Sequence, residues 1–457
     1  MEYKPDIYEK RLENICRGEP FAIAVVTATK PDFYKQAPVV AAATERGVPC
    51  FVIHTGQHYD DVLGHGLTEY GLEDHVVADL GVRGDLTQKT AQMNLAVQSL
   101  ADTLDEYGTT VLPIVHGDTH AAGIFPQAWM FATNQRVAHN EAGLRGMAPE
   151  YTRLDRPETL VADQWDGEWH IERSEPFPEQ YDTFVGSAAS LYQFAPVELN
   201  RDHLLSEGYP ESVAGQQRIP VVGNSVVDAI EMKADETLAE SIFDIYPVLE
   251  ERDEWIRVDI HRRANLLPER FTALVEGVMA LVEDGYNVNF VELTATRRAL
   301  ENYGYREQLE RLAETHENFL YTGLWKRHAH VYEFLRSGQC FAELTDSGSM
   351  QEELNYIDEA ICLTARFNTD RPETVFDAET NLLVPPHSGD QVHDTVEYVA
   401  ETDAVRDRIS TGPNLYGENV GEQIVDFLAD RRADGVFEWS HERLGFDHDE
   451  KREFQYL

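Results

Sequence analysis

The stretch Leu344-Thr-Asp-Ser-Gly-Ser-Met-Gln-Glu-Glu353 decides the fold of the second half of this chain. The apolar run at 341–344 that leads into it is typical of a buried strand. Residues 346–348 are typical of a tight turn, and a helix is expected to begin near Ser349. A helix that follows such a turn points free backbone N–H groups and the positive end of its dipole at whatever lies above it. The stretch therefore predicts an anion site suited to a diphosphate, although an ordinary βα turn has the same pattern.

The rest of the chain alternates between strand-like and helix-like segments, in two runs. Helical periodicity is found, for example, at 86–104 and 268–283, and it separates the apolar runs. Continuous apolar runs, typical of strands buried on both faces, occur at 21–29, 50–54, 110–115, 136–139, 255–260, 288–293, 340–344 and 360–363. This alternation predicts an α/β fold of two Rossmann-like domains facing across a cleft. No G-x-G-x-x-G occurs, so a bound dinucleotide is not indicated.

Composition describes a globular and very acidic protein. The 457 residues are 42% hydrophobic and 10% aromatic, enough for more than one domain, and the formal net charge is −44. Because the acidic residues are spread along the chain, we interpret them as a halophilic surface; an acidic interaction surface is the alternative. Nucleic acid and anionic membranes both need a basic surface, so neither is expected as a partner.

The four cysteines are expected to be small core residues in a reducing compartment. Cys16, Cys50, Cys340 and Cys362 form no C-x-x-C pair and no His/Cys metal spacing, so no metal is expected. The N-terminus lacks a signal-peptide pattern, and no apolar run approaches membrane-spanning length. We therefore expect a cytoplasmic protein.

A series of short motifs identifies a possible family. In chain order they are Ala28-Thr-Lys-Pro-Asp32 with Lys35, Gly56-Gln-His-Tyr-Asp60, His116-Gly-Asp-Thr119, His139-Asn-Glu-Ala-Gly-Leu-Arg145, Pro176-Phe-Pro-Glu179, Val222-Gly-Asn-Ser-Val-Val-Asp228, His261-Arg-Arg-Ala-Asn265, the opening stretch, Thr369-Asp-Arg-Pro-Glu373 and Asn414-Leu-Tyr-Gly417. Each motif is weak alone, but together and in this order they resemble the non-hydrolysing UDP-N-acetylglucosamine 2-epimerases.

The resemblance implies a fold and a set of partners. It implies a glycosyltransferase-B-like architecture, with an N-terminal domain at 1–200, a UDP-binding domain at 201–414, and a C-terminal helix within 415–457, at about 421–433, that returns to the first domain. It also implies a UDP-sugar substrate and no cofactor. A homodimer is expected. The charge-rich insertion at 146–175 is expected to be a solvated loop that could act as a lid.

The implied reaction interconverts UDP-GlcNAc and UDP-ManNAc by loss and re-addition of UDP through a glycal. It needs an acid/base group on each face of the sugar and stabilisation of the leaving diphosphate. The resemblance gives these catalytic roles to Asp118, Glu141, Glu179 and His261. Without the resemblance, Asp118 would be interpreted as the N-cap of a helix that begins at Thr119, and the other carboxylates as turn or loop residues. His116 and His139, at strand ends, are interpreted as packing residues.

The remaining candidates would bind the substrate. Cationic and polar side chains, together with the turn before the helix, would hold the diphosphate and orient the sugar. These substrate-binding candidates are Lys30, Lys35, Gln57, Arg145, Ser347, Gly348, Ser349, Glu353 and Arg371.

Several positions depart from the family pattern. Lys30 and Thr183 stand where the family has Arg, and Ser349 stands where it has Gly. A His-containing loop of the family corresponds to Val291-Glu-Leu-Thr294. Two alternatives therefore stay open: a hydrolysing 2-epimerase that releases ManNAc and UDP, and a sugar-nucleotide-binding protein without turnover.

Overall fold

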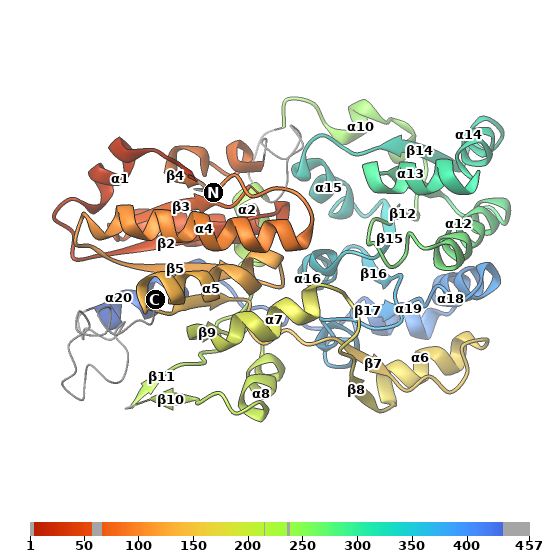
Figure 1. Cartoon of the computed structure of the whole chain (residues 1–457). Coiled ribbons are helices and arrows are strands. Elements are labelled where there is room, and N and C mark those ends of the chain that lie inside the picture. Colours follow the sequence, from red (N-terminus) through yellow and green to blue (C-terminus); the bar gives the residue numbers. More distant parts are fainter. Residues whose placement is uncertain (1–3, 57–65, 214, 235–237, 433–457) are drawn as a thin grey trace. The chain divides into compact units, whose positions relative to one another are not determined.

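The computed structural model describes residues 4–56, 66–213, 215–234 and 238–432 (Figure 1). The chain forms two compact units. Unit 1 consists of Met1–Leu144, Phe177–Ala229 and Gly417–Leu457, and unit 2 consists of Arg145–Pro176 and Ile230–Tyr416. The expected fold class is confirmed, because each unit is built on a mostly or wholly parallel sheet with helices around it.

Unit 1 contains a seven-stranded sheet in the order β1-β4-β3-β2-β5-β6-β9. All neighbours are parallel except β1 and β4. Every residue of the central strand β2 is buried, which explains its unbroken run of apolar residues. The strands are β1 (Asp6–Ile7), β2 (Phe21–Thr27), β3 (Cys50–His54), β4 (Val76–Asp79), β5 (Thr110–His116), β6 (Val137–Asn140) and β9 (Ser190–Phe194), and a separate hairpin pairs β10 (Ser212–Val213) with β11 (Gln216–Gln217).

Helices flank this sheet, and local capping explains where two of them begin. The Asp85 side chain accepts the Gln88 N–H at the start of α4, and the Thr119 hydroxyl accepts the Ala122 N–H at the start of α5. The helices are α1 (Glu9–Cys16), α2 (Lys30–Glu45), η1 (Glu73–His75), α4 (Leu86–Asp105), α5 (His120–Thr133), α7 (Glu179–Ala188), α8 (Glu198–Ser206) and α20 (Val420–Arg432), and the division between the units falls within α9 (Val226–Ala234).

The C-terminal helix α20 packs on α2 of unit 1. Gly421 allows a close approach, because a Cβ there would lie 2.6 Å from the backbone of Pro38. Arg46, which follows α2, donates hydrogen bonds to Glu422 and Asp426 of α20. The last segment of the chain that the structure describes is therefore part of the first unit.

Unit 2 contains a six-stranded sheet in the order β14-β13-β12-β15-β16-β17, and all its neighbours are parallel. Its strands are β12 (Trp255–Asp259), β13 (Val288–Glu292), β14 (Phe319–Gly323), β15 (Cys340–Thr345), β16 (Ile361–Thr364) and β17 (Asn381–Leu383), and β7 (Met147–Pro149) pairs with β8 (Trp169–Ile171) in a hairpin. Its helices are α6 (Pro157–Asp166), α10 (Ile242–Ile245), α11 (Val248–Glu251), α12 (Pro268–Glu283), α13 (Thr294–Tyr303), α14 (Arg306–Thr315), α15 (His328–Leu335), α16 (Gly348–Tyr356), α17 (Glu373–Phe376), α18 (Gly389–Glu401) and α19 (Asp403–Ile409).

The insertion at 146–175 is not the solvated loop that its charge predicted. It forms β7, α6 and β8 and belongs to unit 2. Met147 and Thr369 exchange backbone hydrogen bonds at 2.7 and 2.9 Å. The buried Gln164 side chain bonds both the N–H and the C=O of Leu383, so the insertion is fixed to the edge of the sheet.

The division of the chain also differs from the expected boundary at residue 200. Residues 145–176 group with unit 2, whereas residues 201–229 group with unit 1. One reason is that the Asp228 side chain accepts the backbone N–H of Gly421, which ties the start of α9 to α20. The expected C-terminal part of the first domain begins at Gly417 rather than at 415.

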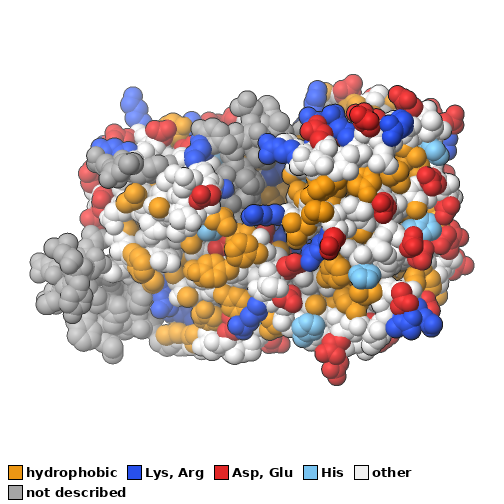
Figure 2. Space-filling view, turned by 45° about the vertical axis from the view of Figure 1, so that its right-hand side comes forward, with side chains coloured by type: hydrophobic (Ala, Val, Ile, Leu, Met, Phe, Trp, Pro, Cys, Tyr) orange, Lys and Arg blue, Asp and Glu red, His pale blue; other side chains and the backbone are white. Residues whose placement is uncertain are grey.

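The four cysteines are all buried and none forms a disulfide, as expected for core residues. Among the helices that the structure describes, none is both long and apolar enough to cross a membrane. Acidic side chains are spread over much of the face shown in Figure 2 and lie between Lys and Arg side chains.

Candidate functional site

Each unit places a group of polar side chains just beyond the C-terminal ends of its parallel strands. This is the edge at which open α/β sheets bind ligands. In unit 1 the group follows β5 and β6, and in unit 2 it follows β12 and β15.

Glu141 lies at the centre of the group in unit 1. Its side chain is 2% exposed, and its Oε1 accepts hydrogen bonds from Lys35 Nζ at 2.7 Å and Asn224 Nδ2 at 2.8 Å. Its Oε2 lies 3.2 Å from His116 Nε2. These contacts join two expected site residues, Lys35 and Glu141, and add two polar partners that sequence reasoning did not assign to the site.

The backbone around Glu141 is unusual. Glu141 has a φ of 62°, in the left-handed region that costs a residue with a side chain about 1–2 kcal/mol. Gly117 faces it, and a Cβ at this glycine would lie 2.6 Å from Glu141 Oε2. A strained residue next to an obligatory glycine is characteristic of a functional position.

His116 is held by Asp32 on the side opposite Glu141. Its Nδ1 lies 3.0 Å from Asp32 Oδ1. The other oxygen of Asp32 accepts the N–H groups of Ala28 and Thr29, each at 2.8 Å, at the start of α2. The interpretation of His116 as a packing residue missed this role, because the contact joins residues that are far apart in the sequence. His139, by contrast, contacts the backbone: its Nε2 lies 2.8 Å from the carbonyl oxygen of Gly117.

Asp118 precedes α5, and Glu179 begins α7. The helix after β5 is capped by Thr119, so Asp118 precedes the cap and is not needed for it. Asp118 is partly exposed, and Glu179 is the partly buried first residue of α7. Lys30 is the partly exposed first residue of α2.

A buried pair fixes the helix that begins at Glu179. His120 Nδ1 lies 3.1 Å from Asp182 Oδ2, and the two side chains join α5 to α7. Burial raises the pKa of Asp182, and the hydrogen bond from His120 opposes this rise. Thr183, at the position where the family has Arg, is buried and donates its hydroxyl to Gln180 O at 2.9 Å. Position 183 therefore contributes to helix packing in this chain.

In unit 2, Asp346 organises the loop that follows β12. Its fully buried carboxylate accepts the N–H groups of His261 at 3.0 Å and Arg262 at 2.9 Å. It also accepts Asn265 Nδ2 at 3.1 Å. The turn after β15 and the loop after β12 are therefore fixed to each other.

The imidazole of His261 lies between two carboxylates. Its Nδ1 is 2.9 Å from Asp259 Oδ1 and 3.2 Å from Asp346 Oδ1. The packing around the ring disfavours the imidazolium, but Asp346 and Asp259 together outweigh this effect and raise the pKa of His261. The side chain is still 38% exposed, so the cation can meet a ligand.

The helix α16 presents its N-terminus to two guanidinium groups. Ser347 caps the helix, and its hydroxyl accepts the Met350 N–H. A Cβ at Gly348 would lie 3.0 Å from both Arg262 Nη2 and Arg371 Nη1, so these cations lie directly over the first turn. Two cations at a helix N-terminus are suited to an anion, and the anion site at the opening stretch stays a prediction. Arg262 was not among the predicted binding residues.

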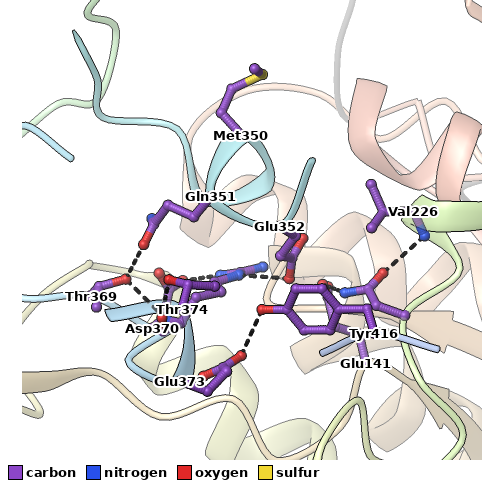
Figure 3. A network of polar contacts seen from close by, with 12 residues as sticks. Glu141, Val226, Met350, Gln351, Glu352, Thr369, Asp370, Glu373, Thr374 and Tyr416 are labelled. Atoms are coloured by element: carbon purple, nitrogen blue, oxygen red, sulfur yellow. Dashed lines mark hydrogen bonds and ion pairs between the residues drawn. The ribbon is translucent and has the colours of Figure 1, made fainter. Parts of the chain in front are cut away.

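A buried network positions Arg371 (Figure 3). Its Nε donates to Glu352 Oε1 at 2.9 Å, and its Nη1 donates to Asp370. In the same network the Tyr416 hydroxyl donates to Glu373 Oε1 at 2.9 Å. Burial raises the pKa of Glu373 to about 7. Sequence reasoning identified Arg371 but not the partners that fix its orientation.

The remaining predicted residues differ in accessibility. Glu353 is buried, and its Oε2 lies 3.3 Å from His328 Nε2. Ser349 and Arg145 are also buried, at 8% and 0% exposure. Gln57 lies outside the described residues.

One cluster near the anion site could be mistaken for a metal site. Ligand atoms of Asp259, His261 and Asp346 lie within 4.8 Å of one another. However, Asp346 already accepts three N–H donors, and Arg366 donates to its backbone oxygen. The Asp346 carboxylate is therefore already occupied by hydrogen-bond donors, which disfavours a metal ion in this cluster.

The fold is glycosyltransferase-B-like, with two guanidinium groups over a helix N-terminus beside one sheet and a buried lysine–carboxylate network beside the other. The family model described as UDP-N-acetylglucosamine 2-epimerase matches residues 167–429, which is more than half of the chain. The chain belongs to this family.

Individual relatives cover most of the chain at low identity. The UDP-N-acetylglucosamine 2-epimerase of Methanocaldococcus jannaschii is 26% identical over 375 residues, 79% of this chain and 88% of the relative. That of Yersinia pestis is 26% identical over 410 residues, 88% and 96% of the two chains. The fold is similar to the crystal structure of the Neisseria meningitidis UDP-GlcNAc 2-epimerase bound to UDP-GlcNAc, with a TM-score of 0.71, 22% identity and coverage of 90% and 100%.

Proposed function

We propose that the chain is a non-hydrolysing UDP-N-acetylglucosamine 2-epimerase that interconverts UDP-GlcNAc and UDP-ManNAc. Membership of the family supports an epimerase. The names of the relatives, one of them crystallised with UDP-GlcNAc, support the substrate. The proposal goes beyond the family in one respect. Both sugars remain attached to UDP, and no free ManNAc is released.

The chemistry requires two kinds of group. C2 of the sugar carries no acidic proton, so the bond from C1 to the diphosphate must break as the C2–H bond breaks. The electron pair of the C2–H bond then forms the C1–C2 double bond of a glycal, and UDP departs as an anion. A proton added to the other face of C2, with return of UDP to C1, completes the inversion. Acid/base groups and fixed positive charge are therefore both needed.

Unit 2 would bind the nucleotide. Arg262, Arg371 and the N-terminus of α16 provide fixed positive charge for a diphosphate. His261, held by Asp259 and Asp346, would add a cation that stabilises or protonates the leaving group. We propose that Ser347, Gly348 and Ser349 supply backbone or hydroxyl donors, and that Glu353 acts on a sugar hydroxyl.

Unit 1 would supply the proton transfers. The observation that carries the proposal is the Glu141 carboxylate, which Lys35 and Asn224 hold in a strained backbone conformation. Asp118 and Glu179, which are less buried, would serve as the other acid/base groups. Lys30 would replace the family's arginine as a point charge rather than a bidentate donor.

Incubation with UDP-GlcNAc in D₂O, without added nicotinamide or metal, tests the proposal. Turnover should place deuterium at C2 of both UDP-sugars, and free ManNAc should not accumulate. Release of ManNAc with UDP would support the hydrolysing alternative. Binding of UDP-GlcNAc without any turnover, also in molar salt, would support the sugar-nucleotide-binding alternative.

Light scattering of the same sample tests the expected homodimer.

A further inference from the structure

We propose that His120 and Asp182 are positioning residues, which hold Asp118 and Glu179 at a fixed separation for proton transfer. The inference rests on the proposed function, because that function gives the two carboxylates their acid/base roles. His120 and Asp182 do not touch the substrate in this proposal. Each acts through the carboxylate that lies close to it along the chain.

The pair joins the starts of two helices. His120 is the first residue of α5 and follows Asp118 by two positions, whereas Asp182 follows Glu179 by three positions in the first turn of α7. The backbone N–H of Asp182 donates to Pro178 O at 3.0 Å and closes this turn. A contact between His120 and Asp182 therefore fixes the two short segments that carry the proposed acid/base groups.

The contact is buried and uses both oxygens of the carboxylate. His120 Nδ1 lies 3.2 Å from Asp182 Oδ1 and 3.1 Å from Oδ2, and the Asp182 side chain is fully buried. A buried carboxylate that loses its hydrogen-bond donor is costly, so the two side chains are expected to move together. The negative charge of Glu179 also contributes to the raised pKa of Asp182, as expected for carboxylates three positions apart on one helix.

The second ring nitrogen of His120 contacts a third helix. His120 Nε2 lies 3.0 Å from Thr90 Oγ1 of α4, and the same hydroxyl donates to Leu86 O at 2.8 Å. Both ring nitrogens therefore have partners, one on α4 and one on α7. The imidazole cannot rotate without losing both contacts, which makes it a fixed reference point for the first turn of α7.

Two glycines bring α5 and α7 close together next to this pair (Figure 1). A Cβ at Gly123 of α5 would lie 2.6 Å from Asp182 Oδ1, and a Cβ at Gly186 of α7 would lie 2.5 Å from Ala122 O. At such distances the helices have little room to shift along each other. The contact between His120 and Asp182 selects one alignment of the two helix starts.

The alternative is a pair that only stabilises the packing of the helices. Such a pair would change the melting temperature and leave kcat per folded molecule unchanged. A positioning role predicts a fall in kcat with little change in the affinity for UDP, because the proposed nucleotide-binding residues belong to unit 2. Kinetics and binding together therefore separate the two roles.

Two substitutions at position 120 divide the contacts of the ring. His120→Asn places an amide N–H near the position of Nδ1, so it can still donate to Asp182 but cannot reach Thr90. His120→Gln places its amide near the position of Nε2, so it can reach Thr90 and loses Asp182. Both variants lose the imidazole, so each is the matched control for the other.

We expect His120→Gln to lower kcat about 100-fold and His120→Asn to keep kcat within about threefold, since a misplacement of about 1 Å has effects of this size. Kd for UDP should stay within about twofold in both variants. Equal kcat values per folded molecule, or the reverse order, would overturn the proposal.

Hydrogen exchange provides a readout that does not depend on activity. The amides of residues 182–185 should exchange faster in His120→Gln than in the wild type, and His120→Asn should resemble the wild type. Equal exchange in the two variants would contradict the positioning of α7 even in an active enzyme. A wild type that turns over no UDP-GlcNAc, with the expected exchange in both variants, contradicts the proposed function and retains the positioning of α7.

A further variant covers the case in which His120→Gln does not fold. The double substitution His120→Gln with Asp182→Leu leaves no carboxylate buried without a donor at this place. The same fall in kcat is expected, because the contact is lost in both proteins. Wild-type kcat in the folded double variant would overturn the proposal.

Discussion

The carboxylate of Asp346 accepts the backbone N–H of His261 at 3.0 Å and lies 3.2 Å from Nδ1 of the same residue. The buried Asp346 therefore fixes the position of His261, which lies 85 residues earlier in the chain, and favours its charged form. Because Asp259 also lies 2.9 Å from Nδ1, the imidazolium has two anionic partners. This arrangement leads to a prediction about pH.

The affinity for UDP should decrease as pH rises above the ordinary histidine range. The pKa of His261 is raised, because Asp346 and Asp259 outweigh the effect of burial. The cation is therefore fully present below about pH 6.5, the pKa of free histidine, and is lost as pH rises through the raised value. A charge-assisted contact to phosphate is worth about 1.5–3 kcal/mol, so Kd should rise about tenfold or more across this transition. Calorimetric titration with UDP between pH 6 and 9 measures it.

Two variants control this experiment. His261→Asn should bind UDP weakly at every pH and show no transition. Asp259→Asn should lower the pH at which affinity is lost, because one of the two anionic partners becomes neutral. A wild-type Kd that is constant from pH 6 to 9 would show that His261 does not contact the nucleotide as a cation.

Gly348→Ala should weaken UDP binding. The new Cβ would lie 3.0 Å from Arg262 Nη2 and Arg371 Nη1, so the guanidinium groups must move away from the first turn of α16. We expect Kd for UDP to rise at least about tenfold, and the melting temperature to fall as well, because the Arg371 guanidinium is held by the buried Glu352 and Asp370. Gly323→Ala, where nothing lies within 4 Å, is the control. Equal UDP affinities for the two variants would argue against the anion site.

Gly117→Ala should lower turnover through Glu141. A Cβ at Gly117 would lie 2.6 Å from Glu141 Oε2, and φ is +63°. Gly108→Ala has the same kind of backbone strain at φ +67°, but nothing lies within 4 Å. Both variants should lose about 1–2 kcal/mol of stability, and only Gly117→Ala should lose kcat, by about tenfold or more. A similar kcat in the two variants would mean that the position of Glu141 does not limit the reaction.

Asp118→Asn and Glu179→Gln should each lower kcat by about two orders of magnitude while UDP affinity stays roughly constant, as for general acid–base groups. Both carboxylates are more exposed than Glu141, so these substitutions leave the buried network intact. Steady-state kinetics and UDP titration provide the two readouts. Near-normal kcat in Asp118→Asn would remove that residue from the catalytic group.

The sequence predicted helices and strands well where one local pattern, such as a continuous apolar run or a helix cap, was strong. The strand, turn and helix expected at 340–353 are β15, the Ser347 cap and α16. Continuous apolar runs also predicted β2, β3, β5, β6, β12, β13 and β16, because strands buried on both faces have no polar side to interrupt them. The parallel strands β4, β9, β14 and β17 were not predicted. The charge-rich insertion at 146–175 was wrongly predicted to be a solvated loop, because a few buried residues, among them Leu160 and Gln164, fix it to unit 2.

Tertiary contacts account for what the sequence did not reveal. His116 bridges Asp32 and Glu141, which lie 84 residues before it and 25 after it, so no local pattern marks it. Arg262 was visible in a basic cluster, yet only the fold shows that its guanidinium meets Gly348. Family motifs identified the residues that bear charge, whereas the partners that fix those charges depend on packing between separate elements.

The melting temperature should rise with KCl well beyond the range of mesophilic proteins. The net charge is −44, and acidic side chains are spread over much of the visible surface (Figure 2), so repulsion among carboxylates should destabilise the folded state at low salt. The Debye length falls from about 10 Å at 0.1 M to about 3 Å at 1 M, which screens most of this repulsion. KM for the UDP-sugar should rise over the same range, because attraction between diphosphate and arginine is screened too.

Thermal melts between 0.1 and 3 M KCl measure this effect. A matched series in sucrose separates charge screening from general stabilisation by excluded solutes, which does not depend on net charge. A melting temperature that is flat or falls with KCl would contradict the halophilic interpretation. The alternative would then be an acidic surface that binds a basic partner, because a complementary charge would relieve the same repulsion without salt.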